Sequence, residues 1–554
     1  MNTTALNRQK RTVNSALWAA YGDAIGFTTE LADASLVKRR TGMAAPVTTT
    51  LAWQRLVGGR FGALVDLPAG SYSDDTQLRL ATSRCIRQDG SFDVESLAKI
   101  ELPVWLNYSL GGGLGSKAAA TSLCSSSTNW YSNFFRTDKA GYVQGGGNGA
   151  AMRVQPHVWC ATDLMNPDSY LPDVVRNAVV THGHVRGIAG AMLHAMSLAF
   201  VLGENRIPAP DEWQSFSSAI AYLPSLVEED SDLKTFWLPT WEAESGITID
   251  IAARAVADEW KQACVDAARQ SLSGKQDYIR LVGDLGGLLP DQRGSGLKTA
   301  LFSLAAAWAM RSQEIGETLA SVANVLGSDT DTIATMAGAL LGALPGQPEP
   351  LADIQDKQYI IADACRLHAI SSRSAVDDFV YPDLLYWQPP KSPLDALGVA
   401  ENFFALYGFG EVEPLGKIIP GRQGEICYQW FRLKSGQTLL CKRRTEPRPV
   451  PTTSLPQPRI ATSNEVRKNL SRQPTDQDLF GDREAVPRAI DAVRDDVVLT
   501  LDAATDEAIR SNFNATVVGK NLLAFAEATN GLELSVAYAA IVVKARRARL
   551  KKGR

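Results

Sequence analysis

The feature that most constrains this chain is a pair of carboxylates at the start of a helix that is apolar on every side. Residues 327–332 read GSDTDT and lead directly into the apolar stretch 332–344. Such a helix belongs in the protein interior, where an unpaired carboxylate is strongly unfavourable. Since no Lys or Arg occurs within ten residues of 328–332, we expect a hard divalent cation beside Asp329 and Asp331, because Mg²⁺ prefers carboxylate and hydroxyl oxygens.

A second acidic segment, Ser73-Asp74-Asp75-Thr76, precedes another helical run. Taken alone, it has a simpler explanation: Ser73 or Asp74 would cap the helix, and acidic residues in a first turn favour the helix dipole. One acidic segment cannot saturate two ions. Two segments could do so if the fold brings 73–75 and 329–332 together.

The histidines and a glycine-rich loop add weaker signals. None of the five histidines falls in a His-x-x-x-His pattern, so a zinc site is not supported. His182 and His184 would lie on different faces of a helix, and polar capping or packing explains them as well as ligand binding does. The loop 145–149 could present backbone N–H groups to phosphate or another anion, or it could be a flexible turn.

Composition excludes several classes of protein. Of 554 residues, 45% are apolar and the net charge is −4, which argues against a generally basic nucleic-acid coat protein. The seven scattered cysteines include no Cys-x-x-Cys pair, which favours a reducing cytoplasm. The N-terminus shows no apolar signal core, and no uninterrupted apolar stretch approaches about 18 residues. We therefore expect a cytoplasmic protein with no membrane span.

The chain divides by pattern into four parts. Residues 1–375 are predicted to be mostly helical, and residues 376–442 carry turn pairs between short aromatic and β-branched runs, which indicates a small β module. Residues 443–480 are rich in proline and polar side chains and are predicted to form a linker. Residues 481–554 contain further helical runs. The predicted fold class is all-α, with a small β module and a C-terminal helical unit.

The chain ends in a strongly basic segment, because seven of its last 11 residues are Lys or Arg. Such a run could contact nucleic acid or an acidic partner. Its simpler explanation is a solvated helix end, whose positive charges suit the C-terminal dipole.

Five segments in this order resemble the ADP-ribosylglycohydrolase family, and the resemblance covers roughly residues 10–350. The matching segments are GDAIGFTTE (22–30), SDDT (73–76), GNGAAMR (147–153), THGH (181–184) and GSDTDTIATMAGALLGALPG (327–346).

The resemblance implies a compact helical fold with two Mg²⁺ ions, or Mn²⁺ in their place, at the bottom of a cleft. Ser73 stands where the family commonly has Thr, and it keeps the hydroxyl. The implied metal ligands are Ser73, Asp74 and Asp75 on one side, and Asp329, Asp331 and Thr332 on the other.

Further roles follow from the same resemblance. Glu30 matches a carboxylate that approaches the metals, and either Asp75 or Glu30 would be the catalytic base. His182 matches a position beside the adenosine ribose. The residues that resemble a cradle for the diphosphate and ribose are Gly147, Asn148, Gly149 and Arg153.

The implied function is Mg²⁺-dependent removal of ADP-ribose from a modified acceptor, with ADP-ribosyl-arginine on a protein as the favoured bond. One alternative is a protein of the same fold that binds ADP-ribose or a nucleotide without cleaving it. Another is a hydrolase that its C-terminal extension carries to nucleic acid or to a toxin partner. We expect a monomer.

One position departs from the family pattern within the acidic segment. Ser328 stands where the family often has a second glycine, which matters only if that residue needs a positive φ.

Overall fold

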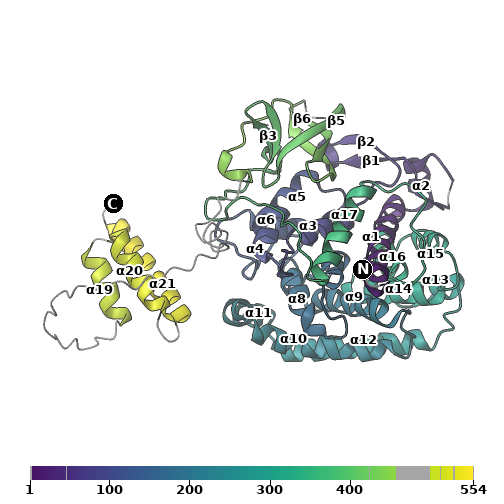
Figure 1. Ribbon diagram of the computed structural model, residues 1–554, viewed down its shortest axis with the longest axis horizontal. Helices are drawn as coiled ribbons and strands as arrows, with labels where there is room; N and C mark the ends of the chain where they lie inside the picture. Colours follow the sequence, from purple (N-terminus) through teal and green to yellow (C-terminus); the bar gives the residue numbers. More distant parts are fainter. Residues whose placement is uncertain are drawn as a thin grey trace, which may run out of the picture. The chain divides into compact units, whose positions relative to one another are not determined.

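The computed structural model describes residues 3–44, 46–422, 424–456, 500–511, 513–527 and 531–552. The chain divides into two compact units, Met1–Ile460 and Ala461–Arg554. The first unit is mostly helical with a small antiparallel sheet, and the described part of the second is helical (Figure 1). The fold class predicted from the sequence is confirmed.

The first unit is built around long helices that are packed in its interior. Its helices include α1 (Thr3–Thr29), α2 (Ala34–Thr41), α3 (Asp74–Arg84), α5 (Leu102–Tyr108), α6 (Leu114–Leu123), α7 (Gln155–Trp159), α8 (Leu171–Val179), α9 (Val185–Glu204), α10 (Ser217–Glu229), α11 (Leu238–Ser245), α12 (Ile249–Ala268), α13 (Lys275–Asp284), α14 (Gly296–Ala309), α15 (Ile315–Ala323), α16 (Thr330–Gly342) and α17 (Lys357–Ser371).

Helices α1 and α16 lie side by side and touch through their backbones (Figure 1). A Cβ atom placed on Gly26 would lie 2.5 Å from the Cα of Asp331, and one placed on Gly338 would overlap the carbonyl group of Trp18. Glycine is required at these positions because no side chain fits between the helices. The contact fixes the position of α16, and with it that of Asp331.

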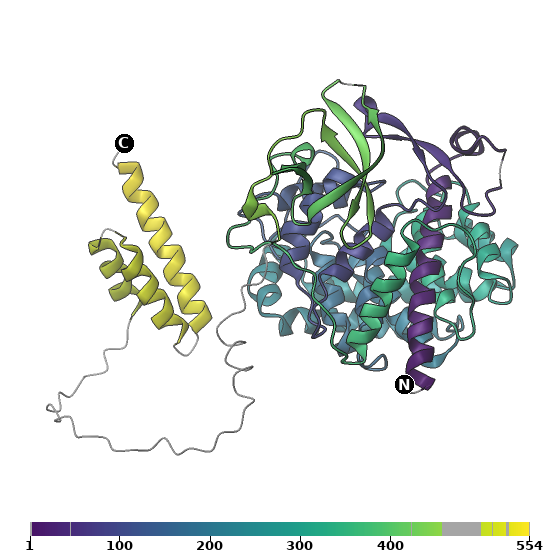
Figure 2. The same ribbon diagram turned by 45° about the horizontal axis from the view of Figure 1, so that its top comes forward.

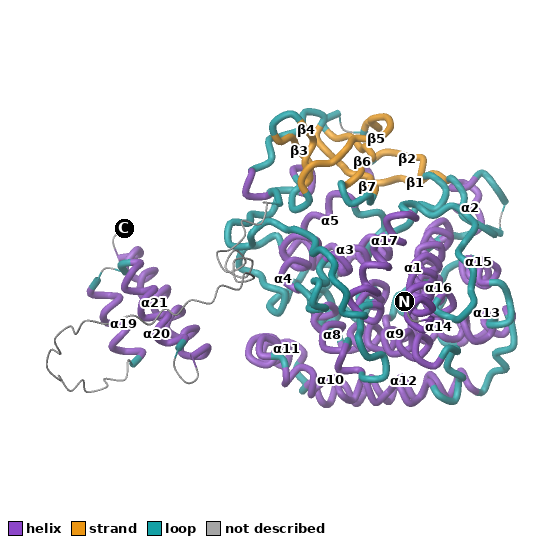
Figure 3. The backbone as a smooth tube through the Cα atoms, in the orientation of Figure 1, coloured by secondary structure: helices purple, strands orange, loops and turns teal. Residues whose placement is uncertain are grey.

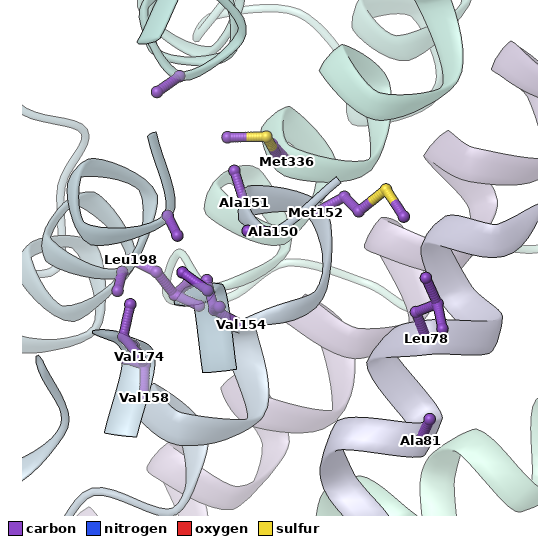
Figure 4. Packing of buried hydrophobic residues seen from close by; sticks show 14 of the residues in the cluster. Leu78, Ala81, Ala150, Ala151, Met152, Val154, Val158, Val174, Leu198 and Met336 are labelled. Carbon is purple, nitrogen blue, oxygen red and sulfur yellow. The ribbon is translucent and has the colours of Figure 1, made fainter. Parts of the chain in front are cut away.

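Helix α9 is the buried helix predicted from its apolar spacing, and it packs against α14. It is the one helix in the described ranges that is long and apolar enough to cross a membrane, and 83% of its apolar window is buried inside the protein. Figure 4 shows its neighbours in the core: Met152 follows Ala150 and Ala151 in a short 3₁₀ turn, and Met336 comes from α16.

A two-stranded hairpin interrupts the predicted helical region. It consists of β1 (Trp53–Val57) and β2 (Ala63–Leu67), paired antiparallel. The expectation that residues 1–375 would be mostly helical missed this hairpin. The side chains of β2 alternate between buried and exposed, but five residues are too few for the period to stand out in the sequence.

The predicted β module forms a five-stranded antiparallel sheet in the order of the chain. The sheet belongs to the same compact unit as the helices, and Figures 2 and 3 show it beside the β1–β2 hairpin. Its strands are β3 (Leu397–Ala400), β4 (Phe403–Leu406), β5 (Gly410–Pro420), β6 (Ile426–Leu433) and β7 (Thr438–Arg444).

The start of the predicted linker is part of the folded unit, which corrects the sequence-based boundary at residue 443. Strand β7 continues to Arg444, and Val399 N–H donates to the Arg448 carbonyl at 2.9 Å. Val450 is buried and donates its N–H back to Val399 at 2.8 Å. Proline enrichment does not exclude such edge pairing, because carbonyl groups still accept. Residues 457–480 of the predicted linker lie outside the described residues.

The described part of the second unit contains α19 (Leu501–Arg510), α20 (Ala515–Ala526) and α21 (Gly531–Lys552). Ala504, Ala508, Phe525 and Tyr538 form its small apolar core. Residues 481–499 of the predicted extension are outside the described ranges, as are most side chains of the basic tail.

The backbone contact between α1 and α16 predicts an unequal response to two Gly→Ala substitutions. Gly338→Ala should lower the thermal midpoint, because overpacking a core costs about 1–3 kcal/mol. Gly316→Ala in α15 is the control, since its Cβ would come no closer than 4.0 Å to Trp18 and Tyr21. Calorimetry that found the two variants equally stable would contradict the close packing.

Acid sensitivity is a second test of the core. Burial lowers the pKa of His194 to about 3. The unfolded chain binds this proton near pH 6.5 and the folded chain does not, so stability falls as the pH drops from about 6.5 to about 3, by about 1.4 kcal/mol per pH unit. His194→Gln should therefore lose less thermal stability than the wild type between pH 7.5 and pH 5. Equal losses would show that His194 is protonated in the folded state.

Candidate active site

A cleft of about 980 Å³ opens in the first unit, and the two predicted acidic segments meet in it. Thr332 Oγ1 donates to Asp75 Oδ2 at 3.4 Å, although the two residues are 257 positions apart in the chain. Most residues predicted from the sequence line this cleft: Glu30, Asp74, Asp75, Gly147, Asn148, Gly149, His182, Asp329, Asp331 and Thr332.

The N-terminus of α3 is held by capping on one side and by α1 on the other. Ser73 is the N-cap residue and its Oγ accepts from the N–H of Asp75 at 3.2 Å. Asp23, from α1, accepts from the N–H groups of Ser73 and Thr76, both at 2.8 Å. Ser73 is fully buried, so its hydroxyl lies beneath the cleft beside Asp75.

The two aspartates that begin α3 have different surroundings. Asp74 Oδ1 accepts from the N–H of Gly112 at 2.7 Å. Asp75 is buried, and its Oδ1 has no hydrogen-bond partner within 3.5 Å among the described residues. A buried carboxylate oxygen without a donor is unfavourable, so this atom is suited to meet a cation or a water proton.

The second acidic segment enters α16 through a left-handed glycine. Gly327 has φ +92°, whereas Ser328 has no positive φ and donates its hydroxyl to the Val325 carbonyl at 2.8 Å. Serine therefore fits at the position where the family often has a second glycine. Asp329 is the N-cap residue of α16 but makes no side-chain cap, which leaves its carboxylate directed to other partners.

Burial and mutual repulsion act together on these carboxylates. Burial, followed by the nearby charges of Glu30 and Asp23, raises the pKa of Asp74 to about 7. Burial also raises the pKa of Asp75 and of Asp331 well above the ordinary value, and neighbouring carboxylates add to both shifts. Ionisation of these carboxyl groups is therefore unfavourable unless a cation is bound beside them.

Glu30 lies just beyond α1 and is held at two points. Its carboxylate pairs with Arg55 of β1 at 3.0 Å, and its carbonyl accepts from Arg40 of α2 at 2.9 Å. The Arg55 guanidinium also lies over the Phe27 ring, 4.2 Å from its centroid. The hairpin that sequence analysis missed thus positions a predicted catalytic residue.

The glycine-rich loop forms one wall of the cleft and is connected to the acidic cluster. Asn148 Nδ2 donates to Asp329 Oδ2 at 2.9 Å and to Thr299 Oγ1 at 3.1 Å. The N–H groups of Gly145, Gly146 and Asn148 already donate to backbone carbonyls. Fewer loop amides are therefore available to an anion than the sequence suggests.

Arg153 does not line the cleft, which corrects the expectation that it cradles the substrate. Its side chain is fully buried and donates to the Asn177 side chain at 2.7 Å and to Thr181 Oγ1 at 2.8 Å. A buried guanidinium needs such acceptors, and both come from the segment that ends at His182. Arg153 therefore supports the cleft wall from behind, and its Nη1 has no hydrogen-bond partner among the described residues.

This support gives His182 a defined orientation. Thr181 Oγ1 accepts from Arg153, so its proton is available to His182 Nδ1, which lies at 2.7 Å. Burial lowers the pKa of His182 to about 3. The neutral ring then carries its proton on Nε2, beside Gly147 and Gly149 at the cleft.

The oxygen atoms of the site meet some of the requirements of a divalent cation. Within the described ranges, no three His, Cys, Asp or Glu side chains are grouped so that they could hold a metal ion. Mg²⁺ is commonly held by one or two carboxylates and several waters, so a triple group is not required. Hydroxyl and carboxylate oxygens from Ser73, Asp75 and Thr332 lie together, and the unpartnered Asp75 Oδ1 is the atom that a cation would satisfy.

Several residues of the site gave no signal in the sequence. Lys117 donates to the Gly111 carbonyl and its charge lies near Asp74, and Arg293 lies near Asp329 at the cleft. Asp23 did give a signal. It is the one carboxylate in the sequence of α1, and this could have identified it as a buried hydrogen-bond acceptor.

A family model described as ADP-ribosylglycohydrolase matches residues 4–374. The chain belongs to the ADP-ribosylglycohydrolase family, as the resemblance predicted.

Relatives are similar over part of their length. The chain is 27% identical to the protein YegU of Escherichia coli strain K12 over 203 residues, which are 36% of this chain and 50% of that relative. It is also 27% identical to the ADP-ribosyl-[dinitrogen reductase] glycohydrolase of Rhodospirillum rubrum over 175 residues, 31% of this chain and 52% of that enzyme. The chain therefore spans about half the length of these relatives.

A solved structure named as an ADP-ribosylglycohydrolase-related protein complex has a TM-score of 0.40 and 20% sequence identity. The similarity covers 66% of this chain and 99% of that one.

The crowding of the carboxyl groups leads to a prediction for the thermal stability of the metal-free protein. Asp331→Asn should raise the thermal midpoint in EDTA at pH 8, because the folded protein raises the pKa of Asp331 and ionisation of this group therefore favours the unfolded chain at that pH. Asp211→Asn, at an exposed position, is the control and should change the midpoint little. A midpoint lowered by Asp331→Asn would mean that this carboxylate is already neutralised by a partner.

Proposed function

We propose that this protein hydrolyses the glycosidic bond between ADP-ribose and a modified acceptor. The observation that carries the proposal is the meeting of Asp75 and Thr332, from distant acidic segments, in the cleft of an ADP-ribosylglycohydrolase-family chain. The cleft volume of about 980 Å³ suits a dinucleotide-sized ligand, since small-molecule sites span about 300–1,000 Å³.

We further propose that the site takes two Mg²⁺ ions, for which Mn²⁺ can substitute. When bound, the ions would supply positive charge that orients the distal ribose and lowers the pKa of water. The residues that would hold them are Ser73, Asp74, Asp75, Asp329, Asp331 and Thr332.

A carboxylate at the cleft removes the proton from the attacking water. Asp75 has a free buried oxygen for this task, and Glu30 is presented to the cleft by Arg55. Asp75→Asn and Glu30→Gln distinguish the two, because only loss of the base removes the pH dependence of proton abstraction.

The acidic cluster also suits the departure of the acceptor. Cleavage of a glycosidic bond develops positive charge on the sugar ring, which nearby carboxylates stabilise. A guanidinium acceptor brings further positive charge, so this environment supports ADP-ribosyl-arginine as the favoured substrate. His182 presents its side-chain N–H along the same wall and is positioned to hold the diphosphate or the ribose hydroxyls. Asn148 donates its side-chain N–H groups to Asp329 and Thr299, and so holds the loop 145–149 against the acidic cluster.

The decisive experiment follows release of free ADP-ribose from an ADP-ribosyl-arginine peptide. Release should require Mg²⁺, should stop with EDTA, and should fall at least 100-fold in the Asp329→Ala/Asp331→Ala double variant, because the site then loses two of its six proposed ligands. Asp211→Ala serves as the matched carboxylate control and should keep wild-type activity.

Other results identify the alternatives. Binding of ADP-ribose in calorimetry, with no release from arginine-, serine- or aspartate-linked substrates, would indicate a protein that binds without cleaving. Release that continues unchanged in EDTA would contradict the metal proposal and leave the carboxylates as the catalytic groups. Retention of the full chain on nucleic acid at low salt would support a targeting role for the C-terminal extension.

A further inference from the structure

The five-stranded sheet begins at Leu397, beyond residue 374 where the family match ends. We infer that this sheet is a positioning element of the active site and that Gln437, in the turn between β6 and β7, is its principal positioning residue. The inference concerns the geometry of the cleft, and its kinetic consequence rests on the proposed hydrolysis.

Gln437 connects the sheet to both ends of α3. Its side chain is fully buried, and its Oε1 accepts from Arg84 Nη1 at 2.6 Å, while its Nε2 donates to the Tyr72 hydroxyl at 3.3 Å. Arg84 is the last residue of α3, and Tyr72 directly precedes the Ser73 cap. One side chain therefore holds groups that flank the helix bearing Asp74 and Asp75.

Thr438 reinforces this connection through a shared carboxylate. Its N–H and its Oγ1 donate to the two oxygens of Asp356, each at 2.8 Å. The Tyr72 hydroxyl donates to the same carboxylate at 2.7 Å. Tyr72 is thus fixed directly by Gln437 of the β6–β7 turn and, through Asp356, by Thr438 of β7.

The buried charge of Arg84 makes the Gln437 contact energetically important. Arg84 pairs with Glu101 at 2.7 and 2.9 Å, and both side chains are almost fully buried. Without Gln437, Arg84 Nη1 would keep only the Tyr359 hydroxyl, at 3.4 Å. A buried guanidinium that loses an acceptor moves to find another, and Arg84 is the end of α3.

The sheet also packs against apolar residues that lie near Glu30 and near Gly112 in the chain. Tyr428 of β6 and Leu440 of β7 share an apolar cluster with Phe27, Trp53 and Leu110. Strands β1 and β2 lie beside β5–β7 in Figure 3.

These apolar contacts lead directly to site residues. Trp53 begins the strand that carries Arg55, the partner of Glu30, and the Phe27 ring lies under the Arg55 guanidinium. Leu110 is two residues before Gly112, whose N–H holds Asp74. The polar and apolar contacts of the sheet therefore end on Glu30, Asp74 and Asp75.

The test uses full-length protein and follows hydrogen exchange of the segment 72–78 by mass spectrometry, together with kcat and KM for ADP-ribosyl-arginine peptide. Gln437→Leu should speed exchange of 72–78 about tenfold and lower kcat about tenfold, with KM changed less than twofold. Gln437→Glu keeps an acceptor for Arg84 and should recover most of both losses.

Leu226→Ala is the control for a general loss of stability. Leu226 is buried in α10, which packs against α12 and not against the sheet. Its thermal midpoint should fall through the cavity that it creates, while exchange of 72–78 and kcat stay at the wild-type level. Thr438→Val, which removes one bond to Asp356, replaces Gln437→Leu if that variant does not fold.

The outcomes separate this inference from the proposed function. Unchanged exchange of 72–78 in folded Gln437→Leu and Thr438→Val would overturn the positioning role, whatever the activity of the wild type. Faster exchange in these variants, combined with a wild type that releases no ADP-ribose from arginine-, serine- or aspartate-linked substrates, would support the positioning role and reject the hydrolysis.

Discussion

The direct backbone contact between α1 and α16 is the constraint on which the site depends. Gly26 brings α1 against the Cα of Asp331, and its carbonyl accepts from Thr330 Oγ1 at 2.9 Å. Three residues earlier, Asp23 binds the N-terminus of α3. Helix α1 therefore contacts both acidic segments, and a shift of α1 along α16 would separate the groups that must act together.

The same arrangement places charge where it is costly for stability. Two of the positive groups near the cluster are already engaged, since Arg55 pairs with Glu30 and Lys117 donates to the Gly111 carbonyl. Buried like charges are kept in proteins where function requires them and where the surrounding structure holds them in place. Here the surroundings include glycine contacts, the Asp23 anchor and the five-stranded sheet, which together resist relaxation of the cluster.

The acidic segments could be predicted as a site from the sequence alone. The apolar helix that follows Asp329 and Asp331 must be buried, whereas burial of an unpaired carboxylate is unfavourable. The role of Arg153 could not be predicted, because the acceptors of its guanidinium, Asn177 and Thr181, are identified only by the fold. The β1–β2 hairpin could not be predicted for a different reason. Its strands are short, and they pack against the side chains of Tyr428 and Leu440, which are distant in the sequence. Long-range partners of this kind leave no local pattern.

The pairing of α1 with α16 has a consequence during synthesis of the chain. Helix α1 ends at Thr29 and α16 begins at Thr330, so the first helix leaves the ribosome long before its partner exists. At about 5–20 residues per second, the interval is roughly 15–60 s. Throughout that time the apolar, glycine-lined face of α1 has no native surface to cover it. The nascent chain must therefore either keep this face solvated or shield it by temporary contacts until α16 has been synthesised.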